Sequence, residues 1–276
     1  MPAWSKKRLA KGLAFGALAL AIGVGMLYLA SLRIWLSAAA TPPAPMASIP
    51  ATTFAMGYEP PGPLSPHKES RHEVELSAFS IDLHETTVGH YLRCVRAGRC
   101  RWRITLLRKP LEAPMGGVTW NDAQDYCRFV GKSLPTEAQW ELAARGVDGR
   151  DYPWGETWQP EKANACDGEN CSGEIDGYAE AAPPGSFPQG AGPYGVLDMA
   201  GNMLEWVYDW SSDDYYSQSP RRDPRGPAEG TVKVVRGGSY FPADMGTPDR
   251  LKTWRRTTDP PDVRPDHIGF RCAREN

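Results

Sequence analysis

Residues 194–206, with the sequence YGVLDMAGNMLEW, carry the strongest indication of the fold. They place two acidic residues, Asp198 and Glu205, among glycines and apolar residues on a turn-forming segment. Carboxylate oxygens interleaved with backbone carbonyls on such a loop form the hard oxygen shell that calcium prefers. Acidic residues also close turns and helix ends, so a capping role is the alternative. Either way, the segment predicts a loop-rich domain rather than a helical bundle.

The chain before this segment is also rich in loops. Residues 146–195 are dominated by Gly, Pro and Asp and show no clear hydrophobic period. A loop of that length in a compact domain needs contacts other than a strand ladder, and a local disulfide or a bound metal would provide them. The 28 glycines, 26 prolines and ten tryptophans of the 276 residues agree with long ordered loops packed on aromatic side chains.

Regular elements are expected on both sides of these loops. Helices are predicted from Val88 to near Gly98, over residues 120–130, and from Thr136, where Gln139 completes a capping box. Short, half-buried strands are predicted by alternating or apolar patterns. Their ranges are 52–57, 73–76, 79–82, 232–235 and 268–272, whereas residues 242–265 are expected to be a loop.

The N-terminal segment has the pattern of a membrane anchor. Twenty-one uncharged residues from Gly12 to Leu32 are long enough, at about 1.5 Å per residue, to cross a bilayer, and four basic residues precede them. Because positive flanks stay in the cytoplasm, we expect residues 1–11 inside, a signal anchor over 12–36, and a Pro/Ala-rich linker over 37–50. The folded part would then lie at the membrane outside the cytoplasm, in a periplasmic or extracellular location. A cleaved signal peptide is the alternative.

Charge and cysteine content agree with export. Five of the 31 basic residues but none of the 33 acidic ones lie in the first 50 residues, so the remainder is acidic. An acidic body argues against nucleic acid as a partner. Six cysteines in an exported chain indicate disulfides, with fifteen possible pairings. The short spacings favour Cys94 with Cys100 and Cys166 with Cys171, which leaves Cys127 for Cys272; zinc binding is an alternative for the second pair.

Several motifs, in order and at similar distances, resemble the formylglycine-generating enzyme or sulfatase-modifying factor family. The resemblance covers residues 51–276 and implies a single α+β domain with the C-type-lectin-like fold and little regular structure. The motifs are GVTWNDA at 117–123, KSLPTEAQWE at 132–141, YPWG at 152–155, the 194–206 segment, VRGGSY at 235–240 and GFRC at 269–272.

The resemblance also implies two structural calcium sites and one disulfide. The residues that match the first calcium site are Asn164, Ala165, Asp176 and Tyr178, where Ala165 and Tyr178 contribute carbonyls. Those that match the second site are Asp198, Gly201, Met203 and Glu205, where Gly201 and Met203 contribute carbonyls. The family's bridge between a helix and the last strand matches Cys127 and Cys272. A second family bridge is missing, since its positions fall on Ala144 and near Thr253.

The catalytic cysteines of the family are absent. The family oxidises a sulfatase cysteine to formylglycine with two thiolates that bind copper(I), and these positions hold Pro242 and Thr247. A tryptophan common in the family is replaced by Leu204. We therefore expect calcium but no copper and assign no catalytic residue. Iron is disfavoured as well, because no two of the five histidines have the spacing of a helical ligand pair.

Two functions remain open at this point. The first is a binding or accessory module for an exported protein or peptide. Its predicted groove comprises Ser239, Tyr240, Asp244, Trp254, Arg255 and Arg256. The second is an enzyme, either a formylglycine-generating oxidase or another protein-maturation enzyme, because some exported relatives without the cysteine pair act in the maturation of secreted products.

Overall fold

The computed structural model describes residues 41–58, 70–165, 176–241 and 248–276. Residues 42–276 form one compact unit with its own core. The predicted basic segment and signal anchor lie outside the described residues. In the described ranges, no helix combines the length and the hydropathy needed to cross a membrane.

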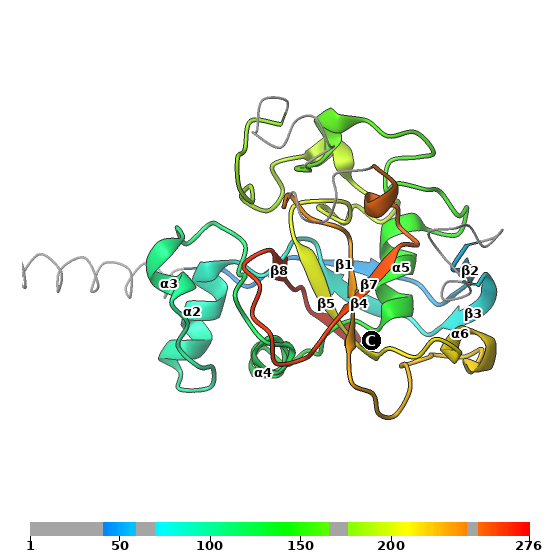
Figure 1. Ribbon diagram of the computed structural model, residues 1–276, viewed down its shortest axis with the longest axis horizontal. Helices are drawn as coiled ribbons and strands as arrows, with labels where there is room; N and C mark the ends of the chain where they lie inside the picture. The colour runs from blue at the N-terminus through cyan, green and yellow to red at the C-terminus, as the bar shows by residue number, and fades with distance from the viewer. Residues whose placement is uncertain (1–40, 59–69, 166–175, 242–247) are drawn as a thin grey trace, which may run out of the picture. The chain divides into compact units, whose positions relative to one another are not determined.

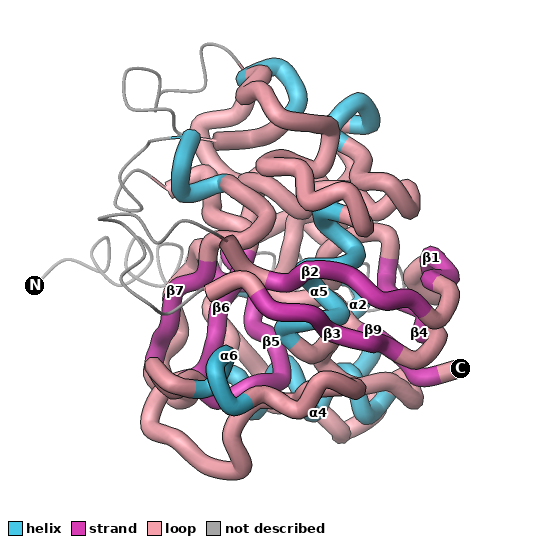
Figure 2. The backbone as a smooth tube through the Cα atoms, turned by 90° about the vertical axis from the view of Figure 1, so that its right-hand side faces the viewer, coloured by secondary structure: helices cyan, strands magenta, loops and turns pink. Residues whose placement is uncertain are grey.

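Three small sheets form the framework of the domain (Figures 1 and 2). The first has the order β1-β4-β9, the second pairs β2 with β3, and the third has the order β7-β6-β5-β8. All pairs are antiparallel except β5 with β8. The strands are β1 Met46–Ile49, β2 Thr52–Met56, β3 His72–Leu76, β4 Phe79–Asp82, β5 Leu204–Trp210, β6 Lys233–Arg236, β7 Arg256–Asp259, β8 Ile268–Gly269 and β9 Ala273–Glu275.

Helices are concentrated in the first half of the chain. Those longer than one turn are α2 Val88–Arg96, α4 Trp120–Phe129 and α5 Glu137–Arg145. Each begins with a capping box, from Thr87, Thr119 and Thr136 respectively, so local sequence fixes where these helices start. The short helices are α3 Thr105–Arg108, α6 Tyr215–Gln218 and the 3-10 turns η1 Pro160–Lys162, η2 Pro188–Gly190 and η4 Pro248–Leu251.

Helix α5 lies at the centre of the domain. It contacts β2 and β3 on one side and β5 and β6 on the other, which joins two of the sheets. Its Trp140 is fully buried, and seven of its other eight residues are buried as well. The described loops of residues 150–165 and 176–200, green to yellow in Figure 1, lie beyond one end of this helix. An α+β domain with little regular structure is therefore confirmed.

Three local expectations are wrong. The linker predicted over 37–50 is shorter, because residues 46–49 form β1 and pair with β4. The strand at 79–82 is buried along its whole length rather than half-buried, since it lies between β1 and β9. The loop predicted over 242–265 contains η4 and also β7, which adds an edge strand to β6.

Two of the three proposed disulfides are present. Cys94 is bonded to Cys100, and Cys127 is bonded to Cys272, which joins α4 to the segment before β9. The long-range bridge closes a loop of 145 residues, which constrains the unfolded chain far more than the local one does. Cys166 and Cys171 lie outside the described residues.

Candidate functional site

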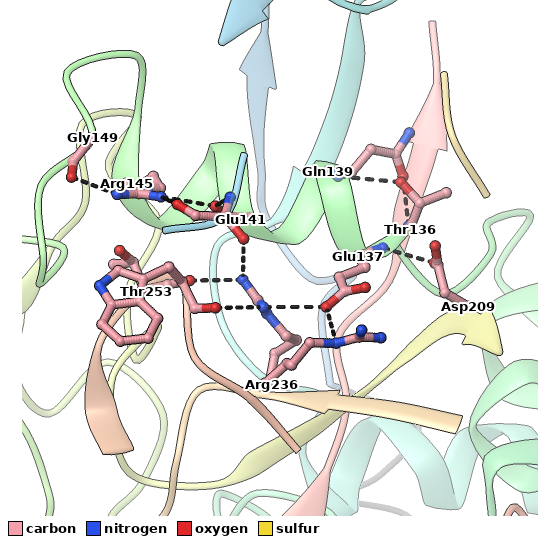
Figure 3. Close-up of polar contacts among 12 residues, drawn as sticks. Thr136, Glu137, Gln139, Glu141, Arg145, Gly149, Asp209, Arg236 and Thr253 are labelled. Atoms are coloured by element: carbon pink, nitrogen blue, oxygen red, sulfur yellow. Dashed lines mark hydrogen bonds and ion pairs between the residues drawn. The ribbon is translucent and has the colours of Figure 1, made fainter. Parts of the chain in front are cut away.

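A buried guanidinium organises one end of the third sheet (Figure 3). Arg236, the last residue of β6, donates to Glu137 and Glu141 of α5, at 3.2 and 2.6 Å. The same guanidinium donates to the backbone oxygens of Thr253 and Trp254, at 2.7 and 3.1 Å. Arg236 therefore fixes α5, β6 and the segment that leads into β7 relative to one another.

The two α5 carboxylates are themselves shared. Glu141 also accepts from Arg145, at 2.9 Å, and from the backbone N–H of Gly57, at 2.7 Å. Burial opposes its ionisation, but Arg236 and Arg145 outweigh it and hold the pKa of Glu141 below its usual value. Glu137 lies 2.9 Å from the guanidinium of Arg256, the first residue of β7. The network is thus a set of paired buried charges.

Asp209 on β5 behaves differently from these carboxylates. It is fully buried and accepts the backbone N–H of Glu137, the first residue of α5, at 2.8 Å. Burial raises its pKa to about 7, and the nearby carboxylate of Glu137 adds to this effect. Lys233 and Arg256 oppose the rise only in part.

Next to this network the structure has a pocket with a basic wall. Its void volume is about 340 Å³, which includes the open solvent at its mouth. The lining combines apolar residues of β5 and β6, the two glycines that follow β6, and three arginines. The lining residues are Leu204, Val235, Gly237, Gly238, Arg250, Arg255, Arg256 and Thr257.

The glycine turn after β6 shapes the floor of the pocket. Gly238 has a φ of 68°, and a Cβ there would lie 2.6 Å from the side chain of Leu251. Only glycine fits both the backbone conformation and the close approach of η4. The turn brings η4, and with it Arg250, against the end of β6.

The three arginines are held to different degrees. Arg256 is paired with Glu137, and the guanidinium of Arg255 lies 5.6 Å from the ring centre of Trp254. Arg250 makes no hydrogen bond or ion pair within the part of the chain that the structure describes. A guanidinium without a partner among the described residues, in a pocket with two further arginines, favours an acidic ligand group such as a carboxylate, sulfate or phosphate.

The groove predicted from the sequence is found only in part. Arg255 and Arg256 line the pocket, but Trp254 is buried, stacks on Tyr58 with ring centres 4.2 Å apart and donates to Asp151. Ser239 is buried and accepts from the backbone of Phe241, while the half-buried Tyr240 lies outside the pocket lining. Asp244 lies outside the described residues. Sequence reasoning missed Arg250, because only the fold of the glycine turn brings it here.

Three members of the first predicted calcium set are in contact. The carboxylate of Asp176 accepts the backbone N–H groups of Ala165, at 3.2 Å, and Tyr178, at 2.9 Å. The side chain of Asn164 donates to the backbone oxygen of Glu180 at 2.9 Å. Asp176 is thus bound to the two residues whose carbonyls were matched to calcium, but through their backbone N–H groups. The residue types still suit a hard cation, so calcium at this set stays a prediction.

The second predicted set does not form a ligand shell. Both oxygens of the buried Glu205 accept from Arg271, at 2.6–3.0 Å, and Trp140 donates to one of them at 2.9 Å. Asp198 accepts the backbone N–H of Gly185. The carboxylate matched to calcium is thus paired with an arginine, and calcium at Glu205 stays a prediction that these contacts do not support. Among the described residues, no group of three or more His, Cys, Asp or Glu side chains could hold a metal ion.

A third buried acid next to this set was missed by sequence reasoning. Glu85 accepts from the side chain of Asn202, at 2.7 Å, and from the backbone N–H of Met203, at 3.1 Å. Burial, with Asp198 and Glu205 nearby, raises the pKa of Glu85 well above its usual value. Through these two hydrogen bonds, Glu85 connects the turn of residues 201–203 to the segment that precedes α2. The raised pKa means that burial favours the protonated form of its carboxyl group.

The motifs, the fold and the disulfide between α4 and the segment before β9 agree with a sequence match of residues 36–276 to the sulfatase-modifying factor enzyme 1-like domain. The chain belongs to this family. The family resemblance inferred from the motifs is therefore confirmed.

Relatives within the family differ in what their names say about activity. The formylglycine-generating enzyme of Streptomyces coelicolor is 41% identical over 169 residues, which are 59% of this chain and 52% of that protein. A protein of Bos taurus named inactive C-alpha-formylglycine-generating enzyme 2 is 37% identical over 171 residues, 60% of this chain and 52% of that protein. The chain thus spans about half the length of each.

A solved structure of the sulfatase-modifying factor family's fold covers more of the chain. PvdO from Pseudomonas aeruginosa superimposes with a TM-score of 0.67 at 26% identity, over 84% of this chain and 94% of that one. This match supports the topology described above.

The two positions that match the family's copper ligands, Pro242 and Thr247, lie outside the described residues; the sequence alone shows that neither is a cysteine. The four described cysteines are all bonded in disulfides. A disulfide sulfur is not the thiolate that copper(I) requires. In the described part of this sulfatase-modifying factor family member, no cysteine is available for the family's oxidase chemistry.

Replacing Asp209 by Asn tests the electrostatic description of this region. The folded pKa of Asp209 is raised, so the stabilisation that comes from its protonated form is complete below about pH 4 and is lost as the pH rises toward 7. Asn keeps the acceptor for the Glu137 N–H without a charge. Between about pH 5 and pH 8, the wild type should lose about 3 kcal/mol of unfolding free energy relative to the variant, measured by urea denaturation. The variant Asp125→Asn, at an exposed position, is the control and should behave like the wild type. Parallel curves of unfolding free energy against pH for the wild type and Asp209→Asn would contradict the raised pKa of Asp209.

Proposed function

We propose that this family member is a membrane-anchored, exported binding or accessory module that lacks copper oxidase chemistry. The observation that carries the proposal is the state of its cysteines. Two replaced positions and two disulfides leave only Cys166 and Cys171 as further sources of thiolate ligands. The 37% identity to a protein named as an inactive enzyme supports the view that the scaffold persists without the oxidase reaction.

The proposed location outside the cytoplasm has support from the structure. Disulfides form and persist in oxidising compartments, and the described domain contains two. The uncharged stretch from Gly12 to Leu32, preceded by basic residues, would anchor the chain with the domain on the outer side. The folded unit begins at Pro42, directly after the predicted anchor and a short spacer.

We propose a structural calcium ion at one site only. Asn164, Ala165, Asp176 and Tyr178 would hold it through side-chain and carbonyl oxygens, and the ion would hold together loops that lack a strand ladder. The proposed ligand of the module is an acidic group of an exported protein or peptide. Its support is the lining of the pocket, in which Arg250, Arg255 and Arg256 lie together with apolar and glycine residues.

Metal content and product analysis test the absence of oxidase chemistry. The full chain, purified from an oxidising compartment, should contain about one calcium per molecule and no stoichiometric copper, by elemental mass spectrometry. Incubation with copper(I), oxygen and a cysteine-containing sulfatase peptide should give no aldehyde by peptide mass spectrometry. The variant Asp176→Asn should lose the calcium.

Two outcomes would contradict this part of the proposal. Aldehyde formation would show that the chain is an oxidase whose thiols lie elsewhere, and Cys166→Ser with Cys171→Ser would then abolish the product. Retention of calcium in Asp176→Asn would show that the first site is not the one occupied.

Binding of an acidic peptide tests the pocket. A fluorescent Glu-rich peptide should bind the wild type at least tenfold more tightly than its Gln-rich counterpart, because guanidinium groups form charge-assisted hydrogen bonds with carboxylates. Arg250→Gln should remove most of that difference in fluorescence anisotropy. The exposed Arg128→Gln, on the outer face of α4, is the matched control. Equal binding of both peptides by the wild type, or no effect of Arg250→Gln, would show that this pocket is not the binding site.

A further inference from the structure

A basic and apolar surface lies at the other end of the domain from the pocket. Between Glu85 and Glu112 the chain contains seven Lys and Arg residues and no acidic residue. This run covers α2, the Cys94–Cys100 loop and α3, although the body of the chain is acidic. The acidic net charge of the body therefore conceals a local basic run.

Large apolar side chains are exposed within the same run. Ile104 is 55% exposed and Leu107 is 64% exposed, and Trp102 is 44% exposed. They are three of the seven large apolar side chains that are exposed in the described ranges. Exposed basic residues flank them on both sides. Together, Arg99, Arg101, Trp102, Ile104, Leu107 and Arg108 form the 99–108 surface.

The domain holds this surface in place. Thr105 and Leu106 point inward and are buried, so α3 directs Ile104 and Leu107 outward. The hydroxyl of Tyr91, on α2, donates to the backbone oxygen of Arg101 at 3.1 Å. Arg103 forms a bidentate ion pair with Asp122 of α4, with N–O distances of 2.5–2.9 Å. The exposure of the apolar side chains is thus part of the fold.

The chain also enters the domain next to this surface. The ring of His90 on α2 forms a hydrogen bond with the backbone oxygen of Pro42 at 2.9 Å. Only five residues, 37–41, separate Pro42 from the predicted end of the anchor, and they reach at most about 18 Å when fully extended. In an anchored chain, the α2–α3 end of the domain is therefore the part held nearest to the bilayer.

We propose that the 99–108 surface docks on the anionic headgroups of the membrane that holds the anchor. Trp102 would lie at the headgroup level, Ile104 and Leu107 would insert their side chains, and the arginines would contact lipid phosphates. Docking would fix the orientation of the domain and leave the pocket facing solvent, because α3 and β7 lie well apart in Figure 1. The inference depends on the anchor that is part of the proposed function.

Hydrogen exchange of the full chain in lipid nanodiscs, with one chain per disc, tests the docking. Peptides that cover residues 99–109 should exchange about tenfold more slowly in discs that contain phosphatidylglycerol than in purely phosphatidylcholine discs or detergent micelles. The difference should shrink at high ionic strength. The double variant Ile104→Ser, Leu107→Ser should lose the protection, whereas Val147→Ser, which changes an equally exposed residue elsewhere, should retain it.

Each other outcome rejects a specific part of the inference. Equal exchange in anionic discs and micelles, for a chain that copurifies with the discs, would overturn the docking but keep the anchor. A chain that does not copurify with discs would overturn the anchor and the docking with it. Protection that appears only with two chains per disc, or only after addition of an oligonucleotide, would show that the surface binds a second copy or a nucleic acid instead of lipid.

Discussion

The buried guanidinium of Arg236 is the interaction on which the organisation of the site depends. Burying a charge raises the free energy of the folded state unless the charge is paired and hydrogen-bonded. Arg236 has all of its partners only when α5, β6 and residues 253–254 are in place. Its partner Glu137 also pairs with Arg256, so the wall of the pocket is fixed through the same carboxylate. Removal of one partner from such a network typically costs about 3–5 kcal/mol, which is a large part of the stability of a domain.

The sequence predicted those elements whose start and end are determined by residues close together in the chain. The helices α2, α4 and α5 begin at threonine capping boxes and end near glycines, and these signals are contained within a few residues. The strand β5 gave no such signal, because Leu204–Trp210 is buried on both faces at its start and does not alternate. The polar strand β7 exists because its backbone pairs with β6. In the site, Arg250 and Glu85 were missed for the same reason, since their neighbours are distant in sequence.

Family membership and function are separate conclusions here. The scaffold, the disulfide between α4 and the segment before β9, and the motifs place the chain in the sulfatase-modifying factor family. The oxidase reaction, in contrast, depends on two thiolates at positions that hold proline and threonine in this sequence. The described domain has a basic pocket at one end and a basic, apolar surface at the other. The proposed binding function rests on these two features.

The count of free thiols in the native protein tests the central claim most directly. Alkylation of the unreduced, unfolded chain, followed by peptide mass spectrometry, distinguishes free cysteines from bonded ones. The account predicts no alkylated cysteine, with Cys94–Cys100, Cys127–Cys272 and Cys166–Cys171 recovered as linked peptides. Stoichiometric alkylation of Cys166 and Cys171 would contradict it, because a thiol pair able to bind copper(I) would then be present.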